Sequence, residues 1–310
     1  MKEQRKVLNI GLAIIGLLAL ICFIIGSFLD QQITKALGNY ESWFGILFTL
    51  LTPVFSLAIG EMAGALLVFM PKRENKTWDI IIRVLGAVIF LGFSAFSIKE
   101  GIEYVEFPVM AEHESTYKVL AIVLVVLIDL AIIFFAKIAS KRKTIDEQRL
   151  IPTVIVILAI IAAWLFVSEV IKHLACRPRP RNIYLHEKIE GVIEFRNWYQ
   201  WQPFFCFKEG MKDCKSFVSG HTFIAACTIG SVPLIHSLSK ERAGIKLTIA
   251  GLCAGGVFTF VVAFSRIVAY AHFMTDVMGA IIFSCGAQAI ILNVAPILYN
   301  KLKSREKGEN

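Results

Sequence analysis

The sequence contains seven cysteines, but it has no C-x-x-C pair and no spacing typical of a metal site. Internal repeats and low-complexity tracts are also absent. No cluster of acidic ligands accompanies the polar motifs described below, so we expect no metal and no other cofactor. Cys206 and Cys214 share one loop and would form a disulfide only if that loop faces an oxidising compartment. Their spacing leaves this question open.

The sequence is also poor in the polar surface that a water-soluble protein needs. Hydrophobic residues make up 56% of the 310 residues, and the mean hydropathy is +0.67. A soluble domain has too little core to bury so much apolar surface, so we expect an integral membrane protein. The net charge of +8 comes from basic residues in short segments between hydrophobic runs, the pattern of cytoplasmic loops. We therefore expect membrane lipids, and no nucleic acid, as partners.

A membrane helix needs about 20 mostly apolar residues. The first apolar segment follows basic residues, as a secretory signal does, but it is too long and no cleavage site follows, so we interpret it as a retained anchor. The fold class predicted is an all-α, polytopic membrane protein with about eight transmembrane helices. The eight segments are 7–29, 43–70, 79–98, 118–138, 151–173, 221–238, 246–268 and 275–299.

The charges of the loops predict the orientation of these helices. Basic residues follow the second, fourth, sixth and eighth segments, whereas loop 99–117 is rich in glutamate. Positive loops stay in the cytoplasm, so we expect both chain ends inside. The only N-x-S/T sequence begins at Asn75 in a loop assigned to the cytoplasm, which favours a bacterial plasma membrane. Segment 172–220 is basic although it is predicted to lie outside, so its charges need another explanation.

Three polar clusters divide the chain into two parts. Residues 1–145 carry four predicted helices and none of the clusters, and residues 301–310 form a basic cytoplasmic tail. Residues 146–300 carry the other four helices and all of the clusters. We expect this C-terminal half to form a catalytic helical bundle.

The first cluster is Lys172-x6-Arg179-Pro180. Pro178 and Pro180 disfavour a helical conformation of the residues before them, so we expect Lys172 in the last turn of a helix and Arg179 in an extended segment. Arginine offers a planar fork that fits phosphate oxygens, and lysine adds a mobile charge. A lone basic residue at a helix end more often only reaches towards the membrane surface.

The second cluster is Ser219-Gly220-His221, at the start of a predicted helix. Free backbone N–H groups and the positive end of the helix dipole suit an anion there, and Gly220 lets the backbone approach it closely. Taken alone, this cluster is better explained by Ser219 and Gly220 as a helix cap and turn and by His221 as an interfacial histidine.

The third cluster is Ser265-Arg266-x5-His272-x3-Asp276. Residues four apart share one helical face, so Asp276 could accept the proton of one ring nitrogen of His272 and leave the other nitrogen bare. This arrangement activates a histidine as a nucleophile. The alternative is that Asp276 caps a helix and His272 is an interfacial polar residue.

The alternating direction of the helices brings the clusters to one side of the membrane. The ends of the fifth and seventh segments and the starts of the sixth and eighth all face outwards in the predicted topology. Three cations, two histidines and a carboxylate would then meet, which suits holding a phosphate and breaking its ester bond.

The three clusters together resemble the signature of the type 2 phosphatidic acid phosphatase and vanadium haloperoxidase superfamily, and of its membrane-bound lipid phosphatase branch. That signature reads K-x6-RP, P-S-G-H and S-R-x5-H-x3-D. The resemblance covers about residues 150–300, and the first and third motifs match at every defined position. Val218 replaces the proline of the second motif, which carries no side-chain chemistry.

The resemblance implies a role for each residue of the clusters. His272 would attack phosphorus and form a phosphohistidine, Asp276 would orient it, and His221 would protonate the leaving oxygen. No metal is implied. The groups implied to surround the phosphate oxygens are Lys172, Arg179, Ser219, Gly220 and Arg266.

We therefore expect an integral membrane phosphatase that acts on a lipid phosphate or pyrophosphate at the outer face. Candidate substrates are phosphatidic acid, phosphatidylglycerol phosphate and undecaprenyl pyrophosphate. Alternatives are a lipid phosphotransferase, a sugar-phosphate phosphatase of the glucose-6-phosphatase type, a haloperoxidase that binds vanadate, and a lipid-phosphate binder or transporter without catalysis. The sequence does not decide the oligomeric state.

Other polar and aromatic residues have two interpretations each. The aromatic loop 196–207 could guide a lipid to the site or pack on the bundle. Glu61 and Asp129 fall in apolar segments, where we expect hydrogen bonds between helices. Glu169 precedes Lys172 by one helical turn and is expected to hold it in place.

Overall fold

The computed structural model is all-helical, with no strand in the residues that it describes. These are residues 2–103, 114–142, 144–185, 194–203, 214–238 and 244–306. In chain order the helices are α1 (Lys2–Leu37), α2 (Trp43–Val68), α3 (Lys76–Glu103), α5 (Glu114–Lys141), α6 (Glu147–Ala175), α7 (Pro180–Tyr184), α9 (Gly220–Cys227), η1 (Thr228–Ser231), α10 (Val232–Ser237), α11 (Ile245–Val268) and α12 (Met274–Glu306).

Seven helices among the described residues are long and apolar enough to cross a membrane. They are α1, α2, α3, α5, α6, α11 and α12, and their outward faces carry large apolar side chains. Leu91, Val257 and Ile290, for example, are 64%, 64% and 65% exposed. Water would disfavour such a surface and lipid would not. The chain is thus a polytopic, all-α membrane protein, as the sequence predicts.

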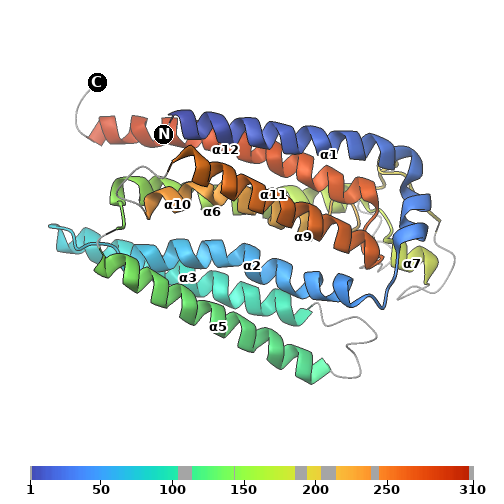
Figure 1. The fold of residues 1–310 in the computed structure, drawn as a ribbon, viewed down its shortest axis with the longest axis horizontal. Helices are drawn as coiled ribbons and strands as arrows, with labels where there is room; N and C mark the ends of the chain where they lie inside the picture. Colours follow the sequence, from blue (N-terminus) through green and yellow to red (C-terminus); the bar gives the residue numbers. More distant parts are fainter. Residues whose placement is uncertain are drawn as a thin grey trace.

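The predicted segment 221–238 differs from the other seven because it is divided into α9, η1 and α10. Pro233, which lacks a backbone N–H, stands in the first turn of α10. Just before it, Gly230 packs so closely on α6 that a Cβ there would lie 2.5 Å from Ile160 Cδ1. The three short pieces follow one another through the centre of the bundle, between the long helices (Figure 1).

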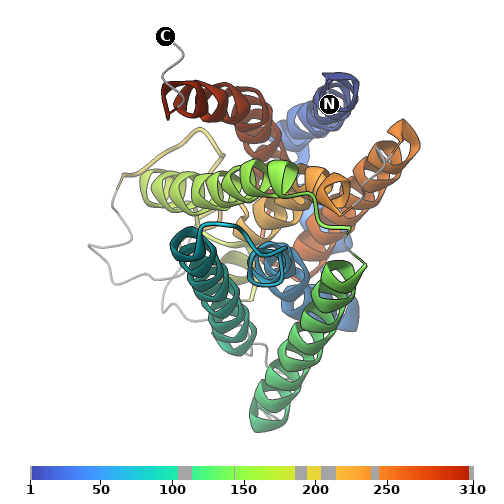
Figure 2. The same cartoon turned by 90° about the vertical axis from the view of Figure 1, so that its left-hand side faces the viewer.

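Helices from both halves of the chain pack against each other. α1 lies along α12, while α2, α3 and α5 form a neighbouring group (Figure 1). α2 also contacts α6, α9 and α11, which carry or adjoin the polar clusters. Viewed from the end that holds the start of α1, the long helices surround the short central pieces (Figure 2). The division of the chain at residue 145 stays a prediction.

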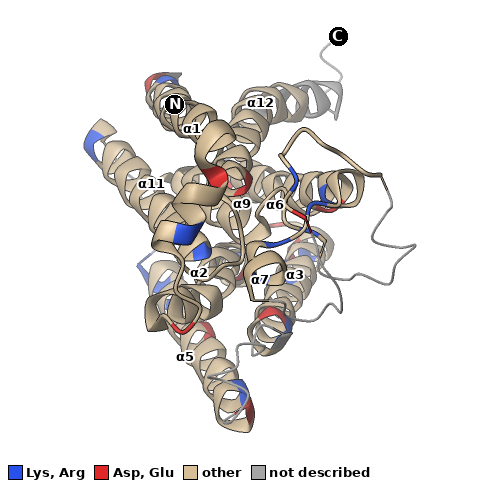
Figure 3. Ribbon diagram, turned by 90° about the vertical axis from the view of Figure 1, so that its right-hand side faces the viewer, with Lys and Arg blue, Asp and Glu red and all other residues tan. Residues whose placement is uncertain are grey.

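The three clusters lie at one end of the bundle. The C-terminal ends of α6 and α11 and the starts of α9 and α12 meet there, next to α7, whereas α1 begins and α12 ends at the opposite end (Figure 1). Figure 3 looks onto this end and shows basic and acidic residues among the helix ends and loops, with few on the helix flanks.

The two carboxyl groups in apolar segments make the expected hydrogen bonds between helices. Ser97 of α3 donates to Glu61 of α2 at 2.8 Å, and Ser94 of α3 donates to Asp129 of α5 at 2.6 Å. These bonds tie α2, α3 and α5 together through carboxyl groups that an apolar environment would not solvate.

Candidate active site

The first cluster sits where α6 ends, as expected. Lys172 lies in the last turn of α6, and Cys176 ends the helix in the left-handed conformation, with φ of 42°. Arg179 is extended, with φ of −80° and ψ of 151°, and immediately precedes α7. The ammonium of Lys172 lies 3.1 Å from Glu169 Oε1, so the predicted partner of Lys172 is confirmed.

The second cluster opens α9. Ser219 is the N-cap residue, and its hydroxyl oxygen accepts from the Thr222 N–H at 3.4 Å. A Cβ on Gly220 would lie 3.1 Å from Lys172 Nζ. The lysine ammonium and the first N–H groups of α9 therefore lie side by side, and only glycine leaves the ammonium its full space.

The third cluster folds around a tight turn between α11 and α12. The backbone N–H groups of Ala271 and His272 donate to the Arg266 carbonyl at 3.1 and 3.2 Å. Tyr270, with φ of 52°, reverses the chain direction. His272 lies in this turn before α12, whereas Asp276 lies in the first turn of α12.

The hydrogen bond of His272 differs from the one that the spacing predicts. Its Nδ1 lies 2.8 Å from the carbonyl oxygen of Ser216 but 3.8 Å from Asp276 Oδ2. The Ser216 hydroxyl instead donates to Asp276 Oδ2 at 2.5 Å. Because a carbonyl can only accept, it places the proton on Nδ1 and leaves the lone pair on Nε2. Nε2 is thus left bare, as the sequence predicts, but the group that accepts the Nδ1 proton is the Ser216 carbonyl and not the Asp276 carboxylate.

The environment of His272 favours its neutral form. Burial is the main reason that the pKa of this imidazole falls from 6.5 to about 3. The positive charges of Arg179 and Arg266 also lower the pKa, and Asp276 opposes them. His272 is therefore unprotonated at Nε2 near neutral pH. Both guanidinium groups thus lie within electrostatic range of the ring.

His221 is oriented by a residue of the first half of the chain. Its Nε2 lies 3.2 Å from the carbonyl oxygen of Thr49 in α2, and Arg266 donates to the Thr49 hydroxyl. Lys172, Arg266 and His272 all lie within electrostatic range of His221. The site thus brings the two histidines together with cations from α6 and α11.

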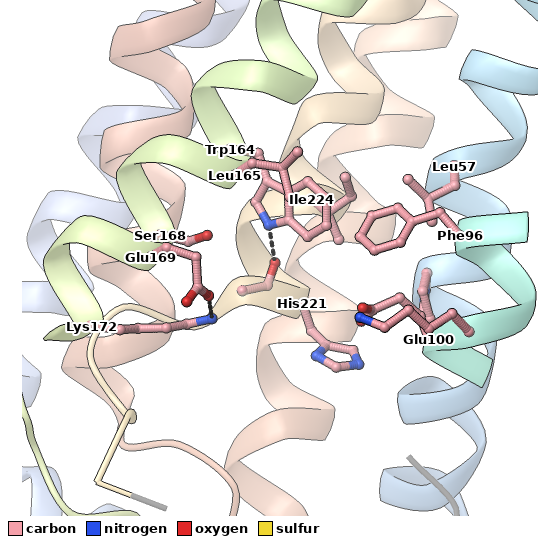
Figure 4. A pocket seen from close by; sticks show the side chains of 13 residues that line it. Leu57, Phe96, Glu100, Trp164, Leu165, Ser168, Glu169, Lys172, His221 and Ile224 are labelled. Carbon is pink, nitrogen blue, oxygen red and sulfur yellow. Dashed lines mark hydrogen bonds and ion pairs between the residues drawn. The ribbon is translucent and has the colours of Figure 1, made fainter. Parts of the chain in front are cut away.

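A cavity of about 380 Å³ adjoins the site between α2, α3, α6 and α9. Its polar end contains Lys172, Glu169, Glu100 and His221, and its other end is apolar (Figure 4). The apolar side chains include Leu57, Phe96, Trp164, Leu165 and Ile224. Trp164 also donates to the Gly220 carbonyl at 3.0 Å, which ties the cavity wall to the second cluster.

The family model described as "PAP2 superfamily" matches residues 152–298. This part of the chain is similar to the PAP2 superfamily. The match begins in the first turns of α6 and ends in α12, so it includes all three clusters and supports a phosphatase-type function. No curated protein and no solved structure matches the chain.

Several residues that complete this PAP2 site were missed by sequence reasoning. Thr49 and Ser216 act through backbone carbonyls, which no side-chain pattern reveals. Arg177 contacts both Asp30 and Asp276. A signal for them existed, because Arg177 stands inside the first PAP2 motif and Asp30 is a charged residue that directly follows the apolar segment 7–29.

The remaining expectations around the PAP2 site are tested only in part. Cys214 is buried and Cys206 lies outside the described residues, so their pairing stays open. Trp198 stacks on Phe217 and donates to the Ser27 hydroxyl at 3.0 Å. This residue of the aromatic loop therefore packs on the helical bundle. Within the described ranges no group of three His, Cys, Asp or Glu side chains could hold a metal ion.

Proposed function

We propose that this protein is an integral membrane phosphatase that hydrolyses a lipid phosphate or pyrophosphate through a phosphohistidine on His272. The observation that carries the proposal is the cavity beside His221, which joins a polar end that holds Lys172 and His221 to an apolar end. A phosphorylated lipid has two matching parts, a polar phosphate group and an apolar chain.

The first chemical step forms the phosphohistidine. The Nε2 lone pair of His272 attacks phosphorus, and the bond from phosphorus to the leaving oxygen breaks. His221 gives its proton to that oxygen, so the lipid product leaves neutral at this position. The Thr49 carbonyl accepts from Nε2 of His221 and leaves Nδ1 as the nitrogen for the leaving group. Burial, Arg266 and His272 lower the pKa of this ring, so its acid form depends on the negative charge of the bound phosphate.

The second step releases phosphate. His221, now neutral, takes a proton from water as that water attacks the phosphohistidine. The bond from phosphorus to His272 Nε2 breaks, phosphate leaves, and the electron pair returns to the ring. Each histidine ends the cycle in its starting state.

The cations stabilise the charge of the phosphoryl group during both steps. Arg179 and Arg266 lie within electrostatic range of His272, and Lys172 lies beside Gly220. The Gly220 N–H and the Ser219 hydroxyl add donors at the start of α9. Fixed donors and charges in a buried site stabilise such a transition state without reorganisation of water.

The apolar wall of the cavity supports a lipid rather than a sugar as the leaving group. The leaving oxygen departs on the side of His221, and the cavity extends from His221 to Trp164, Phe96 and Leu57. A hydrocarbon chain would bury apolar surface there, whereas sugar hydroxyls would lose hydrogen bonds to water. From the loop charges, we assign the site to the outer face of a plasma membrane.

The purified protein tests this proposal in a phosphate-release assay with EDTA present. The panel contains a diacyl lipid phosphate, an isoprenoid pyrophosphate and glucose 6-phosphate in the same detergent. We expect release from one of the lipids, inhibition by vanadate and little release from the sugar phosphate. Activity that requires added magnesium, or a preference for the sugar phosphate, would contradict the proposal.

A further inference from the structure

A buried cluster of charges joins the first helix of the chain to the third motif. Arg177, 2% exposed, donates to Asp30 Oδ2 at 2.9 Å and to Asp276 Oδ1 at 2.6 Å. Asp30 comes from α1 and is 4% exposed, and Asp276 is fully buried. The guanidinium therefore bridges two carboxylates, one of which adjoins His272.

The remaining hydrogen bonds hold this cluster rigidly. Arg177 also donates to the Arg196 carbonyl at 2.8 Å and to the Thr275 hydroxyl at 2.7 Å, and its guanidinium lies 4.3 Å from the centre of the Phe273 ring. Asp30 accepts the backbone N–H of Thr275 at 2.9 Å. Buried ion pairs gain little stability, because removing charges from water offsets their attraction. Their presence beside a nucleophile thus points to a role other than stability.

The charge of the cluster explains that role. Arg177 and Asp276 alone would form a neutral pair. Asp30 adds a second carboxylate, so that the three residues together carry one negative charge. When His272 Nε2 bonds to phosphorus while Nδ1 keeps its proton, the ring becomes positively charged. A neutral pair would stabilise that charge weakly, whereas an anionic cluster in a buried site stabilises it strongly.

We propose that Asp30 and Arg177 are positioning residues for the nucleophile. Arg177 fixes the Asp276 carboxylate, and Asp30 supplies the negative charge that balances the phosphorylated ring of His272. This inference rests on the proposed phosphohistidine function. It makes α1, which lies outside the matched residues 152–298, part of the catalytic unit.

The direct test is the Asp30→Asn variant, which keeps the shape of the side chain and removes one charge. The matched control is Thr34→Val, because Thr34 is also buried and lies one turn further along α1. We expect kcat of Asp30→Asn to fall by at least about tenfold, with KM and vanadate inhibition unchanged, because the phosphate-binding groups are intact. Thr34→Val should keep the wild-type kcat.

A second variant separates charge balance from a purely structural role. Asp30→Glu keeps the negative charge and leaves Arg177 in place. We expect this variant to have a higher kcat than Asp30→Asn, because the net charge of the cluster stays at −1. Thermal melting in detergent is measured for every variant.

Two outcomes would overturn the inference while leaving the proposed function standing. One is a wild-type kcat for Asp30→Asn. The other is a loss of kcat that is matched by equal losses of vanadate affinity and melting temperature, because these together indicate structural damage. Absence of phosphate release by the wild-type protein would instead overturn the proposed function itself.

Discussion

The two histidines of the site are each oriented by a backbone carbonyl. His272 Nδ1 faces the Ser216 carbonyl, and His221 Nε2 faces the Thr49 carbonyl. A carbonyl only accepts, so each bond fixes which ring nitrogen carries a proton. The two residues can therefore take different roles although their side chains are the same.

Replacement of His221 should affect substrates according to their leaving groups. We expect His221→Ala to slow hydrolysis of a lipid phosphate by roughly 100- to 10,000-fold, the usual loss when a general acid is removed. An activated aryl phosphate should lose much less in the first step, because its leaving group needs no proton. Single-turnover kinetics with both substrates measure this difference. Equal losses in the first step would show that His221 does not act as the acid.

A side chain at position 220 should disturb the phosphate site. The Cβ of Gly220→Ala would lie 3.1 Å from Lys172 Nζ and press on the ammonium. We expect kcat/KM to fall by at least about tenfold. The control is Gly286→Ala in α12, where a Cβ would meet nothing within 4 Å. Wild-type kinetics of Gly220→Ala would mean that the ammonium does not need its position beside α9.

At the scale of helices, the first half of the chain contributes directly to the site. α2 carries Thr49 and one wall of the cavity, α3 carries Phe96 on another wall, and α1 carries Asp30. The proposed catalytic unit is thus larger than the matched residues 152–298.

The cavity wall predicts a dependence on lipid chain length. We expect Phe96→Ala to raise KM for a long-chain lipid phosphate several-fold and to leave KM for a short, soluble phosphate ester unchanged. The reason is that this substitution removes apolar contact with the hydrocarbon chain, which a short ester lacks. Phe134→Ala is the control, because Phe134 lies on α5 and is not part of the cavity wall. An equal effect of Phe96→Ala on both substrates would contradict a lipid-binding role for this wall.

The limits of sequence reasoning follow from how each feature is encoded. Long helices and the motif residues were predictable because about 20 apolar residues or a fixed local spacing define them. The break at η1 was not, because hydropathy does not register the close packing of Gly230. The backbone partner of His221 was also missed, because Thr49 and His221 are 172 residues apart. The contact between Asp30 and Arg177 was missed for the same reason, since these residues are 147 positions apart.

At the scale of the whole molecule, the site lies at the opposite end of the bundle from the start of α1 and the end of α12 (Figure 1). With the loop charges, this arrangement predicts a cytoplasmic N-terminus and an external site. Single cysteines in loops 99–117 and 181–215, in a background without the native cysteines, should react with an impermeant reagent in intact cells. Those in 141–149 should not. Labelling of 141–149 would reverse the orientation and place the site in the cytoplasm.

The phosphohistidine intermediate is the centre of this account, and trapping it is the most direct test. The protein is mixed with a ³²P-labelled lipid phosphate in EDTA, quenched in alkali, and the labelled residue is mapped by mass spectrometry. We predict an acid-labile, alkali-stable label on His272, none on His272→Ala, and no phosphate release by that variant. Label on another residue, or near-normal phosphate release by His272→Ala, would contradict the mechanism.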